Sequence, residues 1–215
     1  MSDIIREVDE ELRRENWEKL WKSYGKYVVG AAVGIVLVTA GIVGWREYSQ
    51  YRNRQAGDAF AAVVAQTETA DDPAAAASDL EAYAESAPTG YATLARFREA
   101  RYRALNGDKA GAAALYDELA ADGGVEPLFQ DLAKLYSVRL QIGEADAATL
   151  TTRLEPLTAD DNVWRYSARE LKAIITLQAG DREEARKAYA QLADDLSAPQ
   201  QQRARAAEML RAIGP

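Results

Sequence analysis

The longest apolar run in the chain extends from Tyr27 to Trp45 and contains 19 residues without a formal charge. As an α-helix it has a length of about 28 Å, close to the ~30 Å thickness of the hydrocarbon layer of a bilayer. Aromatic residues stand at both ends, and Lys26 and Arg46 lie immediately outside, as at the two interfaces of a membrane. The pattern therefore predicts a transmembrane helix over residues 27–45.

Two other structures contain runs of this kind. One is a cleaved signal peptide, since Val38-Thr39-Ala40 has the small residues that a signal peptidase accepts. However, 26 residues of mixed charge precede the run, whereas a signal peptide begins with a short basic region. The other is a buried helix of a soluble protein. Four glycines argue against it, because glycine weakens a helix in water by ~1 kcal/mol but is tolerated in membrane helices.

Three of these glycines, Gly30, Gly34 and Gly41, lie on one face of the predicted helix. A ridge of small residues lets two membrane helices approach closely. The ridge predicts a packing face for another membrane helix or for a second copy of the chain, which would give a homodimer. The alternative is that glycine is simply common in membrane helices.

Basic residues on the two sides of the run predict its orientation. Within about 20 residues, five precede the run and three follow it: Arg13, Arg14, Lys19, Lys22 and Lys26, then Arg46, Arg52 and Arg54. An excess of basic residues marks the cytoplasmic side. We therefore expect a cytoplasmic N-terminus and a C-terminal part across the membrane, which is the periplasm in a Gram-negative bacterium.

Residues 1–26, ahead of the run, have apolar positions at three- and four-residue steps among charges, the pattern of an amphipathic helix. These positions are Ile4, Ile5, Val8, Leu12, Trp17, Leu20, Trp21 and Tyr24. A helix of this kind either lies along the cytoplasmic face of the membrane or docks on a partner.

The part of the chain after the run contains an internal repeat with an offset of 73 residues. Gly107-Asp108, Ala112, Tyr116, Leu119 and Ala120 recur as Gly180-Asp181, Ala185, Tyr189, Leu192 and Ala193. A weaker copy at Gly143-Glu144 makes the glycine spacings 36 and 37 residues. We expect each glycine to adopt a positive φ at the end of a helix, and the acid that follows it to begin the next helix.

A period of this length, built from two helices, is typical of an α-solenoid. Alternating runs of β-branched residues are absent from the repeat region, so no strands are expected. The predicted helices cover residues 46–66, 73–86, 91–106, 108–121, 127–142, 144–158, 161–178 and 181–195, and a last helix at 198–213 would cap the stack.

The repeat resembles the tetratricopeptide repeat, whose hairpins carry a glycine at the turn, then alanine, then an aromatic residue at these offsets. The resemblance covers about residues 55–212, and Gly57 lies 50 residues before Gly107, so the first unit is expected to be irregular. The predicted fold class is all-α: one N-terminal transmembrane helix followed by a tetratricopeptide-like α-solenoid with a C-terminal capping helix. The expected domains are an amphipathic cytoplasmic lead (1–26), the transmembrane helix (27–45) and the repeat domain (46–215).

The helix predicted after Gly90 offers a candidate binding site. On a helical wheel, Tyr91, Leu94, Ala95, Tyr102 and Leu105 form an apolar arc with Phe97 beside it, and Arg98 and Arg101 fall inside the arc. Arg96, Glu99 and Arg103 fall on the opposite side, where charge is normally solvated. Phe97, Arg98 and Arg101 are therefore predicted to line the inner groove of the solenoid and to meet a partner's carboxylate. Alternatively, the arginine heads pair with acids on a neighbouring hairpin.

Composition excludes several classes of function. The chain has no cysteine and no histidine, which removes thiol chemistry and the commonest general base and metal ligand. Residues 55–215 contain 17 basic and 26 acidic side chains, which disfavours nucleic acid as a partner. The acidic pairs Asp71-Asp72 and Asp160-Asp161 fall at expected loops and helix starts, where capping explains them. We therefore predict no catalytic residues, no cofactor and no metal.

The order of parts resembles the ancillary SecYEG translocon subunit family (YfgM-like), most clearly at residues 8–27 and at Ala87-Pro88-Thr89-Gly90-Tyr91-Ala92-Thr93-Leu94-Ala95. The resemblance implies a single-pass protein of the bacterial inner membrane that links the Sec translocon, and thus protein translocation, to periplasmic chaperones or emerging client proteins as an adaptor. The alternative function is a membrane-anchored scaffold for envelope assembly or division, unrelated to secretion.

Overall fold

The structure is a computed structural model that describes residues 2–214, with side chains described at position 17 and from position 21 onward. All regular elements in this range are helical, and no strand occurs there. They are α1 (Ser2–Glu68), α2 (Pro73–Ser86), α3 (Thr89–Leu105), α4 (Lys109–Ala121), α5 (Pro127–Gln141), α6 (Ala147–Leu154), the 3₁₀ helix η1 (Glu155–Thr158), α7 (Arg165–Gln178), α8 (Arg182–Asp194) and α9 (Gln200–Ile213). The all-α prediction is confirmed.

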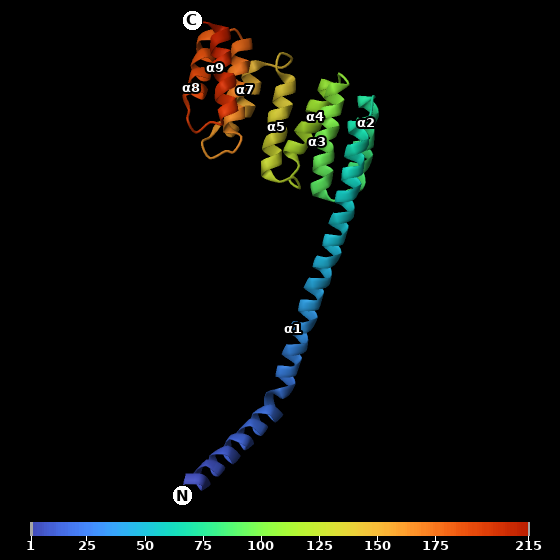
Figure 1. The fold of residues 1–215 in the computed structure, drawn as a ribbon, viewed down its shortest axis with the longest axis vertical. Helices are drawn as coiled ribbons and strands as arrows, with labels where there is room; N and C mark the ends of the chain where they lie inside the picture. The colour runs from blue at the N-terminus through green and yellow to red at the C-terminus, as the bar shows by residue number, and fades with distance from the viewer. Residues whose placement is uncertain (1, 215) are drawn as a thin grey trace. The chain divides into compact units, whose positions relative to one another are not determined.

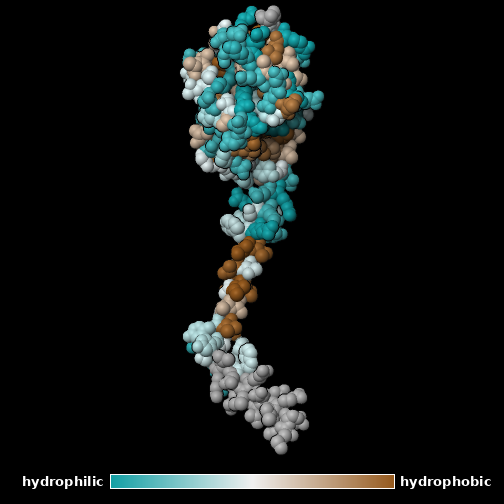
Figure 2. Space-filling view, turned by 90° about the vertical axis from the view of Figure 1, so that its left-hand side faces the viewer, coloured by the Kyte–Doolittle hydropathy of each residue, from teal (hydrophilic) through white to brown (hydrophobic). Residues whose placement is uncertain are grey.

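The apolar run lies within α1 and makes it long and apolar enough to cross a membrane. Figure 2 shows the run as a brown stretch of side chains, with hydrophilic residues on its C-terminal side. The helix start predicted at residue 46 is wrong, because α1 continues through that position to Glu68. No proline occurs before Pro73, so no residue in α1 lacks a backbone donor.

The chain divides into two compact units, and the second begins at Ala56. This second unit contains the helical hairpins. Within it, α2 to α9 lie beside one another in sequence order (Figure 1). Gly107, Gly143 and Gly180 have φ values of 89°, 87° and 91°. Only glycine adopts these values without strain, which confirms the helix ends predicted at the three repeats.

Acidic side chains begin the helices after these glycines. Asp108 caps α4 by accepting a hydrogen bond from the Gly111 N–H at 2.8 Å, and Asp181 caps α8 by accepting one from the Glu184 N–H at 3.1 Å. At the middle repeat, Glu144 was predicted to begin the helix, and this is wrong. Asp146 caps α6 instead, by accepting a hydrogen bond from the Thr149 N–H. The turn after Gly143 is thus two residues longer than the turns after Gly107 and Gly180.

The residues matched by the 73-residue offset occupy equivalent core positions. Ala112 and Ala185 are fully buried, and Tyr116 and Tyr189 are 5% and 1% exposed. The two tyrosines differ in one contact. The Tyr116 hydroxyl donates to the Phe97 carbonyl oxygen at 3.2 Å, whereas the buried Tyr189 hydroxyl has no partner among the described residues. The hydroxyl therefore contributes to stability at one repeat only.

This difference yields a matched pair of substitutions. Tyr116→Phe should lower the free energy of unfolding by about 1 kcal/mol, since a hydrogen bond is lost. Tyr189→Phe should leave it unchanged or raise it slightly, because a buried hydroxyl without a partner is removed. Thermal unfolding followed by circular dichroism measures both. Equal losses at the two positions would contradict this account.

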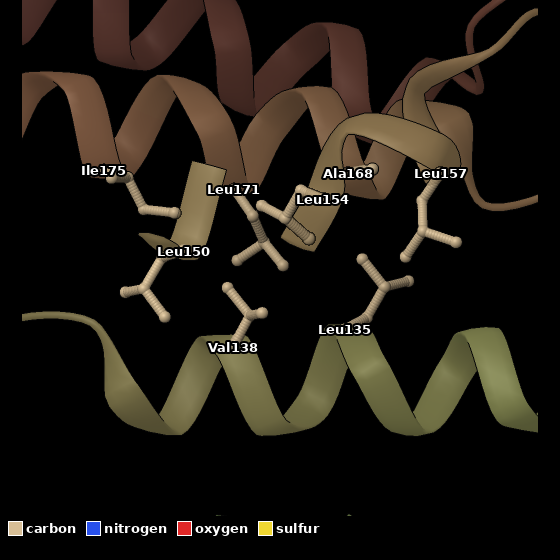
Figure 3. Packing of buried hydrophobic residues seen from close by; sticks show 8 residues of the cluster. All are labelled: Leu135, Val138, Leu150, Leu154, Leu157, Ala168, Leu171 and Ile175. Carbon is tan, nitrogen blue, oxygen red and sulfur yellow. The ribbon is translucent and has the colours of Figure 1, made fainter. Parts of the chain in front are cut away.

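The largest apolar cluster joins α5, α6, η1 and α7. Its members are Leu135, Val138, Leu150, Leu154, Leu157, Ala168, Leu171 and Ile175. Figure 3 shows these side chains converging between α5 and α7, with those of α6 filling the space between. Two features differ from the single helix predicted for residues 144–158: α6 ends at Leu154, and η1 follows it. Pro156 explains the change, because it has no N–H to donate to Thr152 and the backbone tightens into a 3₁₀ turn.

The last helix, α9, packs against α8 and α7 through residues such as Ala206 and Ile213. Its other face carries Gln201, Glu208 and Arg211, all exposed. A solenoid needs a polar outer face on its terminal helix, since no further repeat covers it. The capping helix predicted at the C-terminus is therefore present.

Candidate protein-binding groove

A hollow with a volume of about 850 Å³ lies between α3 and α5 in the second unit. The end of α1 and one residue of α4 complete its lining. The lining residues are Phe60, Leu94, Phe97, Arg98, Arg101, Ala104, Leu105, Tyr116, Phe129, Leu132, Tyr136, Arg139 and Leu140. We call this hollow the arginine groove. All three residues predicted to line a groove, Phe97, Arg98 and Arg101, are part of it.

Aromatic rings form the base of the arginine groove. The Phe97 ring lies 5.5 Å from that of Tyr116, 6.1 Å from that of Phe129 and 6.2 Å from that of Tyr136, measured between centroids. The rings meet at tilted or edge-on angles, which suit their quadrupoles. Burial raises the pKa of Tyr116 to about 12, so its hydroxyl stays neutral and hydrogen-bonded. The base is thus aromatic and uncharged.

Leucine side chains remain exposed at the rim. Leu94 is 37% exposed and Leu105 is 60% exposed, although the helical wheel assigns both to the buried arc of α3. Ala95 from the same arc is fully buried, and it packs with Leu80 of α2. The apolar arc of α3 therefore has two parts. Ala95 packs into the core with α2, whereas Leu94 and Leu105 line the arginine groove.

The prediction for the opposite side of α3 is wrong at one position. Glu99 is 3% exposed, and burial raises the pKa of its carboxyl. α2 covers this face of α3, which a wheel of a single helix does not reveal. Arg103 lies across the carboxylate, with an N–O distance of 2.6 Å, and also reaches Glu81 of α2 at 3.4 Å. The buried charge is therefore paired, as burial requires.

The arginines of the arginine groove differ in their partners. Arg98 forms an ion pair with Glu68 at the end of α1, at 3.4 Å, which is the neighbouring-hairpin pairing weighed as the alternative. Arg139 lies over the Tyr136 ring, 5.4 Å from its centroid. Arg101 is exposed and has no ion pair among the residues with described side chains. Pairing with an acid on a neighbouring hairpin thus accounts for Arg98 but not for Arg101.

Sequence reasoning missed the α5 side of the arginine groove. Phe129, Leu132, Tyr136 and Arg139 recur at three- and four-residue steps, so the wheel that selected Phe97 would have selected them too. A second hollow of about 400 Å³ shares Leu132, Tyr136 and Arg139 and continues towards α7. There Arg205 binds Glu170 through two hydrogen bonds of 2.7 and 2.6 Å. The two hollows therefore adjoin at α5.

The other sequence candidates lie outside both hollows. Gly30, Gly34 and Gly41 lie in α1, and a Cβ added at any of them would meet no atom within 4 Å. The packing role of these glycines stays a prediction. Asp72 caps α2 by accepting a hydrogen bond from the Ala74 N–H at 2.9 Å, and Asp160 pairs with Arg169 at 2.6 Å. Among residues with described side chains, no cluster of three acidic side chains could hold a metal ion.

A family comparison accounts for the repeats. Residues 18–210 match the model of the tetratricopeptide repeat-like domain, so the chain belongs to this family. Comparisons with curated proteins and with solved structures gave no match. Domains of the matched family are typically scaffolds for protein interaction rather than enzymes. The family and the arginine groove together indicate a protein-binding role.

Proposed function

We propose that this protein is a non-enzymatic accessory protein, held in a membrane by residues 27–45, whose repeat domain binds other proteins. The observation that carries the proposal is the arginine groove, an open hollow of about 850 Å³ with exposed leucines at its rim and an aromatic base. Exposed apolar side chains gathered in a concave site are typical of surfaces that bind a partner. The proposed parts are a cytoplasmic lead (1–26), the anchor (27–45) and the binding domain (46–215).

The resemblance at residues 8–27 and 87–95 supports a finer assignment, an ancillary subunit of the Sec translocon in a bacterial inner membrane. The excess of basic residues before the span supports a cytoplasmic N-terminus and a periplasmic repeat domain. The partners would be the translocon and periplasmic chaperones or emerging clients. Anchoring beside the translocon would raise the effective concentration of the arginine groove for emerging clients to the ~mM range. Weak binding by the groove would then be sufficient to capture them.

Removing residues 1–45 should abolish co-purification with the translocon and leave the repeat domain folded. The reason is that the second unit has its own apolar clusters, whereas the segment that would reach the membrane is lost. Affinity purification from detergent-solubilised membranes, followed by mass spectrometry, measures the association, and circular dichroism measures the fold.

The control is the full chain carrying the same affinity tag after Pro215. Co-purification that survives the truncation would count against the translocon assignment. Cross-linking the full chain in native membranes separates this function from an envelope scaffold, which would capture division or assembly proteins and a second copy of the chain instead. A self-cross-link through Gly30 and Gly34 without translocon subunits would favour the scaffold.

A further inference from the structure

The arginine groove has the opposite charge to the domain that surrounds it. Acidic side chains outnumber basic ones by 26 to 17 over residues 55–215. The 13 residues that line the arginine groove nevertheless include three arginines and no acid. A local reversal of charge in a hollow focuses the field onto a ligand of the other sign.

Two of these arginines have no carboxylate partner among the residues with described side chains. Arg101 comes from α3 and Arg139 from α5, and both line the same hollow as Tyr116. Each of the two helices that border the hollow therefore contributes one guanidinium group to its lining. Arginine presents several N–H donors in a fork that fits a carboxylate, so the site can hold one or two carboxylates here.

The remaining lining is apolar and partly open. Leu94, Leu105 and Leu132 line the hollow together with the arginines, and the Phe97 and Phe129 rings form part of its aromatic base. An apolar side chain inserted among these groups would bury area on both molecules and exclude water from the ion pairs. A ligand that uses the whole site therefore combines an apolar group with acidic groups close beside it.

We propose that the arginine groove selects protein segments in which leucine or phenylalanine is flanked by aspartate or glutamate. The proposal rests on the proposed protein-binding function and names the chemistry of the partner. A nucleic acid also offers anionic and stacking groups, but the net negative charge of residues 55–215 repels a long polyanion. A short segment with few acidic residues meets the arginines and experiences less of this repulsion.

Fluorescent pools of 12-residue peptides, tested against the full chain in detergent micelles, can check the proposal. One pool contains Leu, Phe, Asp and Glu in random order; the second replaces the acids by Asn and Gln, and the third replaces them by Lys and Arg. Fluorescence anisotropy should show the acidic pool binding about tenfold or more tightly than the neutral pool, because charge-assisted hydrogen bonds form only with carboxylates. Binding of the basic pool should be the weakest.

The double variant Arg101→Gln/Arg139→Gln should lose this preference, with the acidic pool binding no better than the neutral one. Both side chains are exposed, so the variant should fold, and circular dichroism checks this. Arg211→Gln, an exposed arginine of α9 outside the hollow, is the matched control and should keep the preference. The variant Arg101→Glu/Arg139→Glu should prefer the basic pool.

Three results would overturn the proposal: equal binding of the acidic and neutral pools, a preference that persists in the double glutamine variant, or tighter binding of a 12-nucleotide single-stranded DNA than of the acidic pool. A failure of this proposal can be distinguished from a failure of the proposed protein-binding function. If cross-linking still captures partner proteins while the pools are not distinguished, the protein-binding function stands and only the chemistry of the ligand is wrong.

Discussion

Replacing Leu154 by alanine is expected to lower the free energy of unfolding of the repeat domain by about 3–5 kcal/mol. Leu154 is fully buried and is the last residue of α6, where it joins the cluster between α5 and α7 (Figure 3). Large-to-small changes in a packed core cost the lost transfer energy and leave a cavity. α6 has only eight residues and is held through Leu150 and Leu154, so little can move in to fill the space.

Thermal unfolding of the full chain in detergent, followed by circular dichroism, measures this loss. For a domain of this size the melting temperature should fall by about 10 °C. Leu196→Ala is the matched control, because the same atoms are removed from a side chain that is 86% exposed, and its melting temperature should stay within about 2 °C. Similar shifts in the two variants would mean that the cluster does not hold α6.

The hairpins of the repeat domain could be predicted because their determinants are local. A positive φ at Gly107 or Gly180 requires glycine, and an aspartate beside it caps the next helix, so each turn is determined by two adjacent residues. The helix start predicted at residue 46 had no local determinant of this kind. The chain changes from apolar to charged at Arg46, but arginine favours a helical backbone, so α1 continues through this position.

The candidate site was only partly predictable, for a tertiary reason. A wheel of α3 placed Arg98 and Arg101 within the apolar arc and Phe97 beside it, and the structure places all three in the arginine groove. The wheel could not show which neighbour covers which side. α2 buries Glu99, while Leu105 stays open opposite α5. Arg139 could not be identified from α3 alone, because it lies on α5 and only the tertiary packing brings the two helices to one hollow.

Introducing two arginines at the centre of the apolar run is expected to abolish the proposed anchoring in a membrane. Val33 and Leu37 lie near the midpoint of residues 27–45, one turn apart, and both are exposed in the structure. On the insertion scale the nine Val, Ile and Leu residues of the run favour the membrane by about 3–5 kcal/mol, and two central arginines cost about 5–7 kcal/mol. The balance therefore reverses in Val33→Arg/Leu37→Arg.

The measurement is the share of the protein that stays in membranes pelleted after an alkaline carbonate wash. Ser49→Arg/Asn53→Arg adds the same two charges one turn apart in α1 but outside the run, and it should remain with the membranes, as we expect of the unaltered chain. The decrease should thus depend on position along one helix and not on added charge. Equal retention of both variants would show that residues 27–45 do not cross the bilayer, and the proposed anchoring of the arginine groove would fail with it.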